Sequence, residues 1–230
     1  MSNELNLSRQ SKLIPADKLE KWNVHIFGVG SIGSHLTKVL AKSGFKDITV
    51  YDMDEVGKEN ISAQAFDFSH VGMQKVEAMK QIIKQSTGID IITHDGEITE
   101  ETPLSAEPNT IYVCVFDSLE ARKIVFNKLK DMPIIFVDGR IGGYNLKHFL
   151  VDCSNPDEVA TYEKTLNPEA RSDLVCGEKA CCPINTEISG KMAMNIIKYI
   201  AGLEYTKTHF ENVLFPKSSL ISTKARTEEL

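Results

Sequence analysis

Residues 24–33 read Val-His-Ile-Phe-Gly-Val-Gly-Ser-Ile-Gly. A short apolar, β-branched run that ends at once in glycines is typical of a buried strand. Helical spacing of apolar residues then runs from Ser34 to Ser43, and Gly44 stands where many helices end in a left-handed glycine. Strand, G-x-G-x-x-G and helix in this order are the fingerprint of a dinucleotide-type α/β fold.

The glycine turn predicts a site for the phosphates of a nucleotide. Gly28 permits the tight turn, Gly30 lets the backbone approach a phosphate, and Gly33 lets the helix pack closely on the strand. Ser31 and Ile32 lie in the same turn, just before the helix, whose free N–H groups attract anions. We therefore expect these five residues to bind the nucleotide.

The next predicted strand, 48–51, ends at Asp52, nineteen positions after Gly33. A carboxylate there can accept hydrogen bonds from the ribose hydroxyls of a bound nucleotide. The turn and this aspartate fit an ATP-binding enzyme and an NAD-dependent oxidoreductase equally well, so the choice between them depends on the rest of the chain.

Strands and helices alternate through the first half of the chain. Further strands are predicted at 89–93, 111–116 and 134–137, and further helices at 74–85 and 119–130. This alternation predicts an α/β, Rossmann-like fold: a mostly parallel sheet with right-handed crossovers and helices on both faces.

After Asp138 the pattern changes. The sequence predicts an antiparallel strand at 144–151, an irregular loop with short helical turns at 152–182, a long helix at 184–201 and a last strand near 212–215. We expect a single domain over 1–230, with a nucleotide half at about 22–138, a substrate-side half with an antiparallel extension at about 139–220, and a frayed tail at 221–230.

Composition narrows the class of protein. A net charge of -6 disfavours a general nucleic-acid binder, which is usually basic. No apolar run reaches the roughly 18 residues of a membrane span, so we expect no membrane association. The N-terminus lacks a secretion signal and the five cysteines are an odd number, which together predict a reducing, cytoplasmic setting.

Two further motifs follow the glycine turn. Residues 52–64 read Asp-Met-Asp-Glu-Val-Gly-Lys-Glu-Asn-Ile-Ser-Ala-Gln, and residues 71–78 read Val-Gly-Met-Gln-Lys-Val-Glu-Ala. Over residues 7–202 the chain resembles the ThiF/MoeB/HesA family, relatives of the ubiquitin-activating enzymes. That family follows its glycine turn with D-x-D-x-V-x-x-x-N-x-x-R-Q and then V-G-x-x-K-V-E-A. Each motif is weak alone, but their order is specific.

The resemblance implies an ATP site on this chain. Asp52 matches the ribose-binding aspartate, and Asn60 and Lys75 match residues that contact the phosphates. Asp54 and Gln64 belong to the same motif and are expected to bind the nucleotide as well. Taken without the motif, Lys75 also fits a solvated helix lysine, and Asn60 fits a turn residue that makes local backbone bonds.

Three more positions match the family, and two of them imply metal binding and dimerisation. Asp117 matches the aspartate that holds Mg²⁺, although a helix N-cap is an alternative reading of this residue. Arg9 matches an arginine that reaches across a dimer interface to the ATP phosphates, which implies a homodimer. Arg122 matches a frequent family arginine and is read as structural.

The activity implied by the resemblance is MgATP-dependent adenylation of a carboxylate. The leading substrate is the C-terminal glycine of a small ubiquitin-like or sulfur-carrier protein that ends in Gly-Gly. Adenylation of a peptide or tRNA carboxylate, a non-catalytic partner role, and an NAD-dependent oxidoreductase remain as alternatives.

One position departs from the family pattern. Ala63 stands where the family has the phosphate-binding arginine of N-x-x-R-Q. Three explanations are open: Arg9 and Lys75 suffice, Lys58 or another cation substitutes, or catalysis is weak or absent. We favour retained activity.

The cysteines and one further arginine complete the predicted site. No C-x-x-C pair occurs, so we expect no zinc, in contrast to many relatives. Cys176 lies in the segment that forms a loop over the active site in relatives, so it is our candidate acceptor of the activated acyl group, with an inert buried thiol as the alternative. Cys181 and Cys182 are weaker candidates, and Cys114 is expected in the core. Arg140 either binds a carboxylate or phosphate, or pairs with Asp138.

Overall fold

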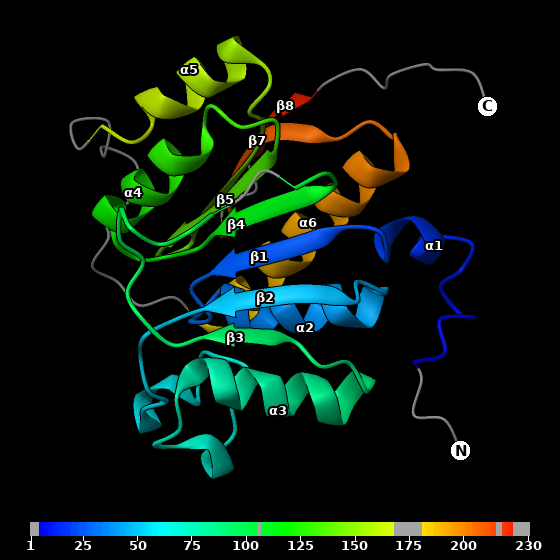
Figure 1. Ribbon diagram of the computed structural model, residues 1–230, viewed down its shortest axis with the longest axis vertical. Coiled ribbons are helices and arrows are strands. Elements are labelled where there is room, and N and C mark those ends of the chain that lie inside the picture. The colour runs from blue at the N-terminus through cyan, green and yellow to red at the C-terminus, as the bar shows by residue number, and fades with distance from the viewer. Residues whose placement is uncertain (1–4, 105–106, 168–180, 215–217, 223–230) are drawn as a thin grey trace.

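The computed structural model describes residues 5–104, 107–167, 181–214 and 218–222 (Figure 1). Eight strands form one sheet in the order β3-β2-β1-β4-β5-β6-β7-β8. Their bounds are β1 Asn23–Phe27, β2 Asp47–Tyr51, β3 Ile92–His94, β4 Thr110–Cys114, β5 Ile135–Gly142, β6 Asn145–Asp152, β7 Thr206–Asn212 and β8 Ser218–Ser222. The helices are α1 Ala16–Leu19, α2 Gly33–Ser43, α3 Lys75–Thr87, α4 Leu119–Leu129, α5 Pro156–Lys164 and α6 Cys182–Ala201, with 3-10 turns η1 Lys58–Asn60 and η2 Phe68–His70.

The first five strands are parallel and the last three pairings are antiparallel. Ile26 at the centre of β1 pairs with Val50 of β2 on one side and Val113 of β4 on the other. The strand order reverses at this point, since β2 and β3 extend away from one side of β1 and β4 extends from the other. In open α/β sheets such a reversal opens a crevice at the carboxyl ends of the strands.

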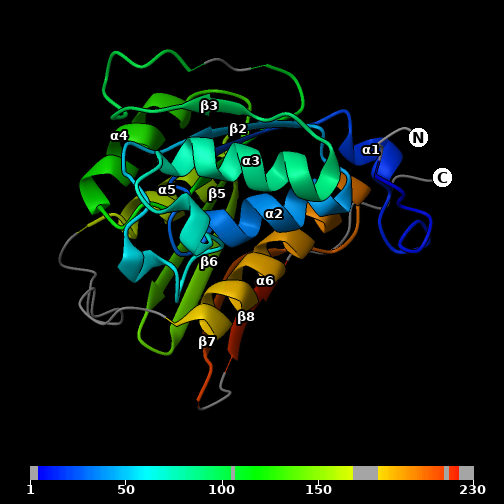
Figure 2. The ribbon, with the colours of Figure 1, turned by 90° about the horizontal axis from the view of Figure 1, so that it is seen from below.

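Helices cover both faces of the sheet (Figure 2). Residues of α2, α3 and α6 form one core with inward-facing strand residues such as Ile111 and Val113. Alternate residues of the same strand, Tyr112 and Cys114, join a second core with α4 and α5 on the opposite face. This alternation follows from the strand period of two, with both sides buried. None of the described helices combines the length and apolar character needed to cross a membrane.

The Rossmann-like fold class predicted from the sequence is therefore confirmed, including the antiparallel extension. Gly44 ends α2 with a φ of 113° and Gly88 ends α3 with a φ of 78°, the left-handed conformation that favours glycine at a helix end. Cys114 is fully buried in β4, as expected.

The prediction of an irregular loop over 152–182 was wrong for residues 156–164, which form α5. The side-chain oxygen of Asn155 accepts hydrogen bonds from the N–H groups of Asp157 and Glu158, and Pro156 occupies the first turn. These are helix-start signals, because the first N–H groups of a helix need external acceptors and proline is tolerated there. A polar, proline-containing stretch was thus taken for a loop when it caps a helix.

Three strand predictions also need correction. The strand predicted at 89–93 is shorter and shifted, at Ile92–His94, because Ile89 and Ile91 pack against the core before the strand begins. β5 continues past 137 to Gly142, since its polar residues still pair with β6. The strand expected near 212–215 ends at Asn212, and β8 runs to Ser222, into the predicted tail.

Candidate functional site

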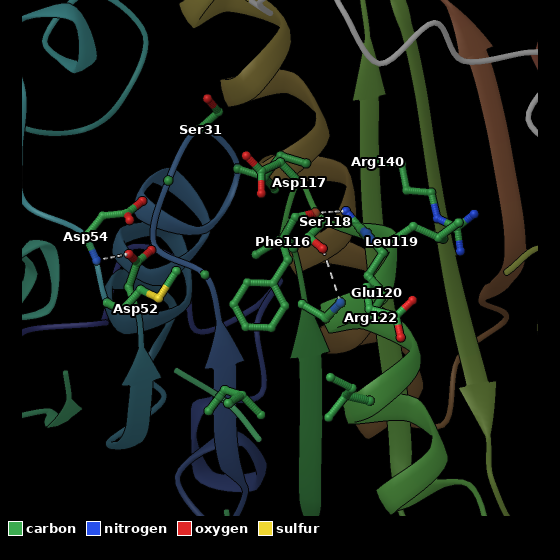
Figure 3. A pocket seen from close by; sticks show the side chains of 18 of the residues that line it. Ser31, Asp52, Asp54, Phe116, Asp117, Ser118, Leu119, Glu120, Arg122 and Arg140 are labelled. Atoms are coloured by element: carbon green, nitrogen blue, oxygen red, sulfur yellow. Dashed lines mark hydrogen bonds between the residues drawn. The ribbon is translucent and has the colours of Figure 1, made fainter. Parts of the chain in front are cut away.

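A cavity of about 1060 Å³ opens at the carboxyl ends of β1, β2 and β4, where the strand order reverses (Figure 3). In Figure 3, Asp52 and Asp54 lie on one side of the pocket, Arg140 lies on the other, and Asp117 lies between them. The predicted site residues that line it are Gly28, Gly30, Ser31, Ile32, Asp52, Asp54, Gln64, Lys75 and Asp117.

The glycine turn has the geometry that its sequence predicts. Gly28 has a φ of 94°, and its N–H donates to the Tyr51 carbonyl at 2.8 Å. A Cβ on Gly33 would stand 1.8 Å from the Gly28 carbonyl oxygen, so only glycine lets α2 start this close to the turn. Gly30 is different, because the one atom that its Cβ would meet within 4 Å is a side-chain nitrogen of Gln64. Gly33 therefore packs, and Gly30 leaves space for a ligand.

Asp52 holds the turn and the start of the next loop together. One carboxylate oxygen accepts from the Val29 N–H at 2.8 Å, and the other accepts from the Asp54 N–H at 3.0 Å. Burial raises the pKa of Asp52, while Lys75, with its Nζ 3.9 Å away, opposes that rise. Each carboxylate oxygen can still accept a further hydrogen bond from a ligand.

Lys75 is a buried ammonium rather than a solvated helix lysine. The residue is 7% exposed, and its Nζ lies 2.6 Å from Oδ2 of Asp54. Its partner faces solvent, since the Asp54 side chain is 58% exposed. A desolvated cation held by an exposed carboxylate can exchange that partner for a ligand anion at modest cost, because Asp54 is readily rehydrated.

The sequence relates Lys58, Asn60 and Gln64 of the loop after β2 to the nucleotide, and one of the three lines the pocket. Gln64 lines the pocket, and its Oε1 is buried without a partner among the described residues. Asn60 does not line the pocket, and its Oδ1 accepts from the Gly57 N–H at 2.8 Å, a local backbone bond of the kind its alternative reading expects. Lys58 is exposed and also lies outside the lining.

Ala63 is fixed by its backbone. The Ala63 carbonyl accepts hydrogen bonds from Nδ2 of Asn185 at 2.8 Å and from the His35 ring at 3.1 Å. The hydroxyl of Ser189, one turn further along α6, donates to the Ile32 carbonyl at 2.9 Å. Helix α6 thus holds both the glycine turn and the loop that carries Gln64. Polar residues on an otherwise apolar face of the predicted helix 184–201 were the available signal for this role.

Asp117 is exposed in the pocket and does not cap α4. The N-cap is Ser118, whose hydroxyl oxygen accepts from the Ala121 N–H at 3.2 Å. Among the described residues, no group of three or more His, Cys, Asp or Glu side chains is arranged to hold a metal ion. A lone carboxylate suits Mg²⁺ that is carried by phosphates, because such an ion keeps several waters and needs one or two protein ligands.

Arg140 pairs with Asp138, the second of its two predicted roles. Its Nε lies 2.8 Å from Oδ2 of Asp138, and its terminal nitrogens donate to the carbonyl and the hydroxyl oxygen of Thr165, each at 3.0 Å. Arg140, Thr165 and Lys164 all line the pocket. The last two were missed from the sequence because their helix was taken for a loop.

Arg9, Cys181 and Cys182 do not line the pocket of this chain. Arg9 is exposed, and its neighbour Gln10 bonds to the Lys42 carbonyl at the far end of α2 from the glycine turn (Figure 1). Cys176 lies outside the described residues. Cys181 is exposed and Cys182 is partly exposed at the start of α6, and neither lines the pocket.

Comparison with known proteins settles the family. The model of the ThiF family matches residues 4–228. The chain belongs to the ThiF family. The family resemblance inferred from the sequence motifs is thereby confirmed.

Relatives of this ThiF-family chain include subunits of activating enzymes. It is 30% identical over 126 residues to the NEDD8-activating enzyme E1 catalytic subunit of Caenorhabditis elegans, which covers 54% of this chain and 29% of that relative. It is 26% identical over 133 residues to SUMO-activating enzyme subunit 2 of Dictyostelium discoideum, covering 56% of this chain and 20% of that relative. The matches thus span less than a third of these longer relatives.

Solved structures share the fold over nearly the whole chain. E. coli MccB with AMPCPP and MccA superposes with a TM-score of 0.69 at 18% identity, covering 93% of this chain and 67% of that one. PaaA superposes with a TM-score of 0.71, also at 18% identity, covering 95% and 68%. At this identity the likeness establishes the fold.

Proposed function

We propose that this chain adenylates a carboxylate with MgATP, and that its substrate is the C-terminal glycine of a small ubiquitin-like or sulfur-carrier protein ending in Gly-Gly. The observation that carries the proposal is the buried Lys75 ammonium, held 2.6 Å from the exposed Asp54 at the edge of the glycine-turn pocket. The names of its relatives, NEDD8- and SUMO-activating enzymes, support the substrate class.

The pocket residues fit a nucleotide. Gly30 leaves open space beside the turn, and the buried Oε1 of Gln64 has no partner among the described residues, so a ligand donor would satisfy it. We assign the ribose hydroxyls to Asp52 and the phosphates to the N–H groups of residues 30–32 at the start of α2. An NAD-dependent oxidoreductase is disfavoured because ThiF-family motifs, not a hydride-transfer site, follow Asp52.

Each charged residue has a proposed role in the reaction. When bound, MgATP supplies the α-phosphorus that the substrate carboxylate attacks, and pyrophosphate leaves. Lys75 stabilises the negative charge that develops on the phosphate oxygens. Asp117 would hold the Mg²⁺ ion, which would supply positive charge at the phosphates. Asp52 and the glycine turn hold the nucleotide still, so that the carboxylate meets it in line.

We also propose roles for Arg9 and Cys176, which are not among the residues lining the pocket. Arg9 lies far from the pocket of its own chain, so it would act only in a second copy, and the homodimer is proposed on that ground. This contribution matters because Ala63 provides no charge and Lys58 lies outside the lining. Cys176 remains our candidate acceptor if the adenylate is passed on to a thiol.

ATP–pyrophosphate exchange tests the function. We expect exchange only when MgATP and a cognate Gly-Gly carrier are both present, and we expect Lys75→Ala to lower its rate by about 10²–10³-fold. Lys80→Ala is the matched control, because Lys80 lies on the same helix and outside the pocket lining. Thermal shift with MgATP against NAD measures nucleotide choice independently. Stabilisation by MgATP without exchange for any carrier, peptide or tRNA would reject an adenylating enzyme in favour of a non-catalytic partner.

A further inference from the structure

A closed polar cluster lies beneath Asp117, on the side of the pocket away from the glycine turn. Its members are Arg122 of α4, Asp138 and Arg140 of β5, and Tyr162 of α5. Asp138 is fully buried and Arg122 is 6% exposed. Asp138 accepts from Arg122, from Arg140, and from the Tyr162 hydroxyl at 2.6 Å.

Arg122 donates hydrogen bonds to the backbone carbonyls around the predicted metal ligand. Its Nη2 donates to the Phe116 carbonyl and, at 3.0 Å, to the Gly139 carbonyl. Its Nη1 donates to Asp138 and, at 3.4 Å, to the Cys114 carbonyl. The guanidinium therefore joins the end of β4 to the middle of β5. Phe116 directly precedes Asp117, so its carbonyl sets the course of the chain into that residue.

The cluster fixes the guanidinium as well as neutralising it. Arg122 is planar, and its donors have a fixed spread, so it can reach several carbonyls only in one orientation. Asp138 sets that orientation, and the Tyr162 hydroxyl holds the other carboxylate oxygen. Burial lowers the pKa of Arg122, because the charged guanidinium loses contact with water. Buried ion clusters add little net stability against apolar packing, so a positional role explains this one better.

We propose that Arg122 is a positioning residue for the metal ligand Asp117, and that Tyr162 supports it through Asp138. The proposal rests on the proposed MgATP-dependent function. A direct contact between Arg122 and the substrate is disfavoured, because both of its terminal nitrogens already donate to the protein.

Tyr162→Phe is the mildest test. It removes the hydroxyl but keeps the ring, which packs against Phe126, Phe136 and Phe149. Arg122→Lys keeps the positive charge but cannot hold three carbonyls and Asp138 in one plane. Thr87→Val is the matched control: it removes another buried hydroxyl, which donates to the Ile83 carbonyl at 2.7 Å, at the far end of α3.

The readout is metal binding to the enzyme–ATP complex, measured with Mn²⁺ by electron paramagnetic resonance, beside the Mg²⁺ dependence of exchange. We expect Arg122→Lys to weaken Mn²⁺ binding by about tenfold, the low end for residues that orient a metal ligand, and Tyr162→Phe by about threefold. Metal-free ATP binding and Thr87→Val should match the wild type. If Arg122→Lys does not fold, Tyr162→Phe decides.

The outcomes separate this proposal from the proposed function. If wild-type protein binds no metal–ATP complex, the proposed function fails and takes this role with it. Unchanged Mn²⁺ binding in folded variants overturns the positioning role and leaves the function intact. A rise in the KM for the carrier alone would also overturn it, because it would assign Arg122 to the substrate.

Discussion

The two flanks of the pocket each hold an ion pair, but one pair includes an exposed carboxylate and the other a fully buried one. Beside the glycine turn, Lys75 meets an aspartate that is 58% exposed. On the other flank, Arg122 meets an aspartate with no exposure at all. The first pair can open, because its carboxylate is already in water, whereas the second cannot open without leaving a buried charge. We infer that the Lys75 flank receives a ligand, and that the Arg122 flank is the frame that holds Asp117 in place.

Removing Arg122 should give the largest effect on stability. We expect Arg122→Ala to lower the free energy of unfolding by about 3–5 kcal/mol, because Asp138 and three carbonyls lose their shared donor inside the protein. Urea unfolding followed by circular dichroism measures it. Lys46→Ala is the control: Lys46 lies 2.6 Å from Glu20 on the surface, and its loss should cost less than about 1 kcal/mol. Equal losses of unfolding free energy in the two variants would contradict the burial of the Arg122–Asp138 pair.

Removing Lys75 should reverse that pattern, with a large effect on catalysis and a small one on stability. We expect Lys75→Ala to lower the rate of carrier-dependent exchange by about 10²–10³-fold, as for other preorganised donors at a developing charge. The free energy of unfolding should change by less than about 1 kcal/mol, since Asp54 stays hydrated and alanine favours the helix. A large loss of stability would mean that Lys75 belongs to the frame.

The glycine turn offers a matched pair on the ligand-binding flank. Gly33→Ala would place a Cβ 1.8 Å from the Gly28 carbonyl oxygen, so we expect it to cost about 3 kcal/mol of stability through forced movement of the backbone. Gly30→Ala meets no close atom, so it should keep stability and weaken ATP binding. Thermal unfolding with and without MgATP separates these effects. Similar behaviour of the two variants would show that Gly30 does not face the ligand.

The structure of the Lys75 flank was predictable because its constraints are local in the sequence. Three glycines fix the turn, β-branched runs fix the strands on either side, and Gly44 and Gly88 end the helices that follow. The carboxyl ends of neighbouring parallel strands meet at one edge, which brings Asp52 and Asp117 to the same pocket. Burial of Lys75 was not predictable, because it depends on how α3 packs.

The frame was largely hidden because its members meet only in three dimensions. Arg122, Asp138 and Tyr162 lie on three elements, and the register of β5 against β4 sets their distances. Two of these residues carried a partial signal: Arg122 was read as structural, and Asp138 was one of two partners considered for Arg140. Tyr162 carried none, since its segment was taken for a loop although Asn155 and Pro156 mark the start of a helix.

The sheet face opposite the frame should respond to acid, through a buried histidine on β6. His148 pairs with Gly139, whose carbonyl Arg122 holds, and its ring stacks on His209 at 5.2 Å. Burial lowers the pKa of His148 from 6.5 to about 3, with smaller contributions from the charges of His209 and Lys191. Between pH 6.5 and pH 3, His148 therefore binds a proton in the unfolded chain but not in the folded protein. The free energy of unfolding is unaffected by this group above pH 6.5, and it falls as the pH is lowered from 6.5 toward 3.

At pH 5 this difference amounts to about 2 kcal/mol, since each pH unit between the two pKa values contributes about 1.4 kcal/mol. We expect the free energy of unfolding of His148→Phe to fall less than that of the wild type between pH 7 and pH 5, by that amount. Urea titrations at both pH values measure the difference. His35→Gln is the control, because His35 is only partly buried and the lowering of its pKa by burial is opposed by its hydrogen bond to the Ala63 carbonyl. Parallel pH profiles for His148→Phe and wild type would mean that His148 gains a proton in the folded state without cost, and that its ring is open to water.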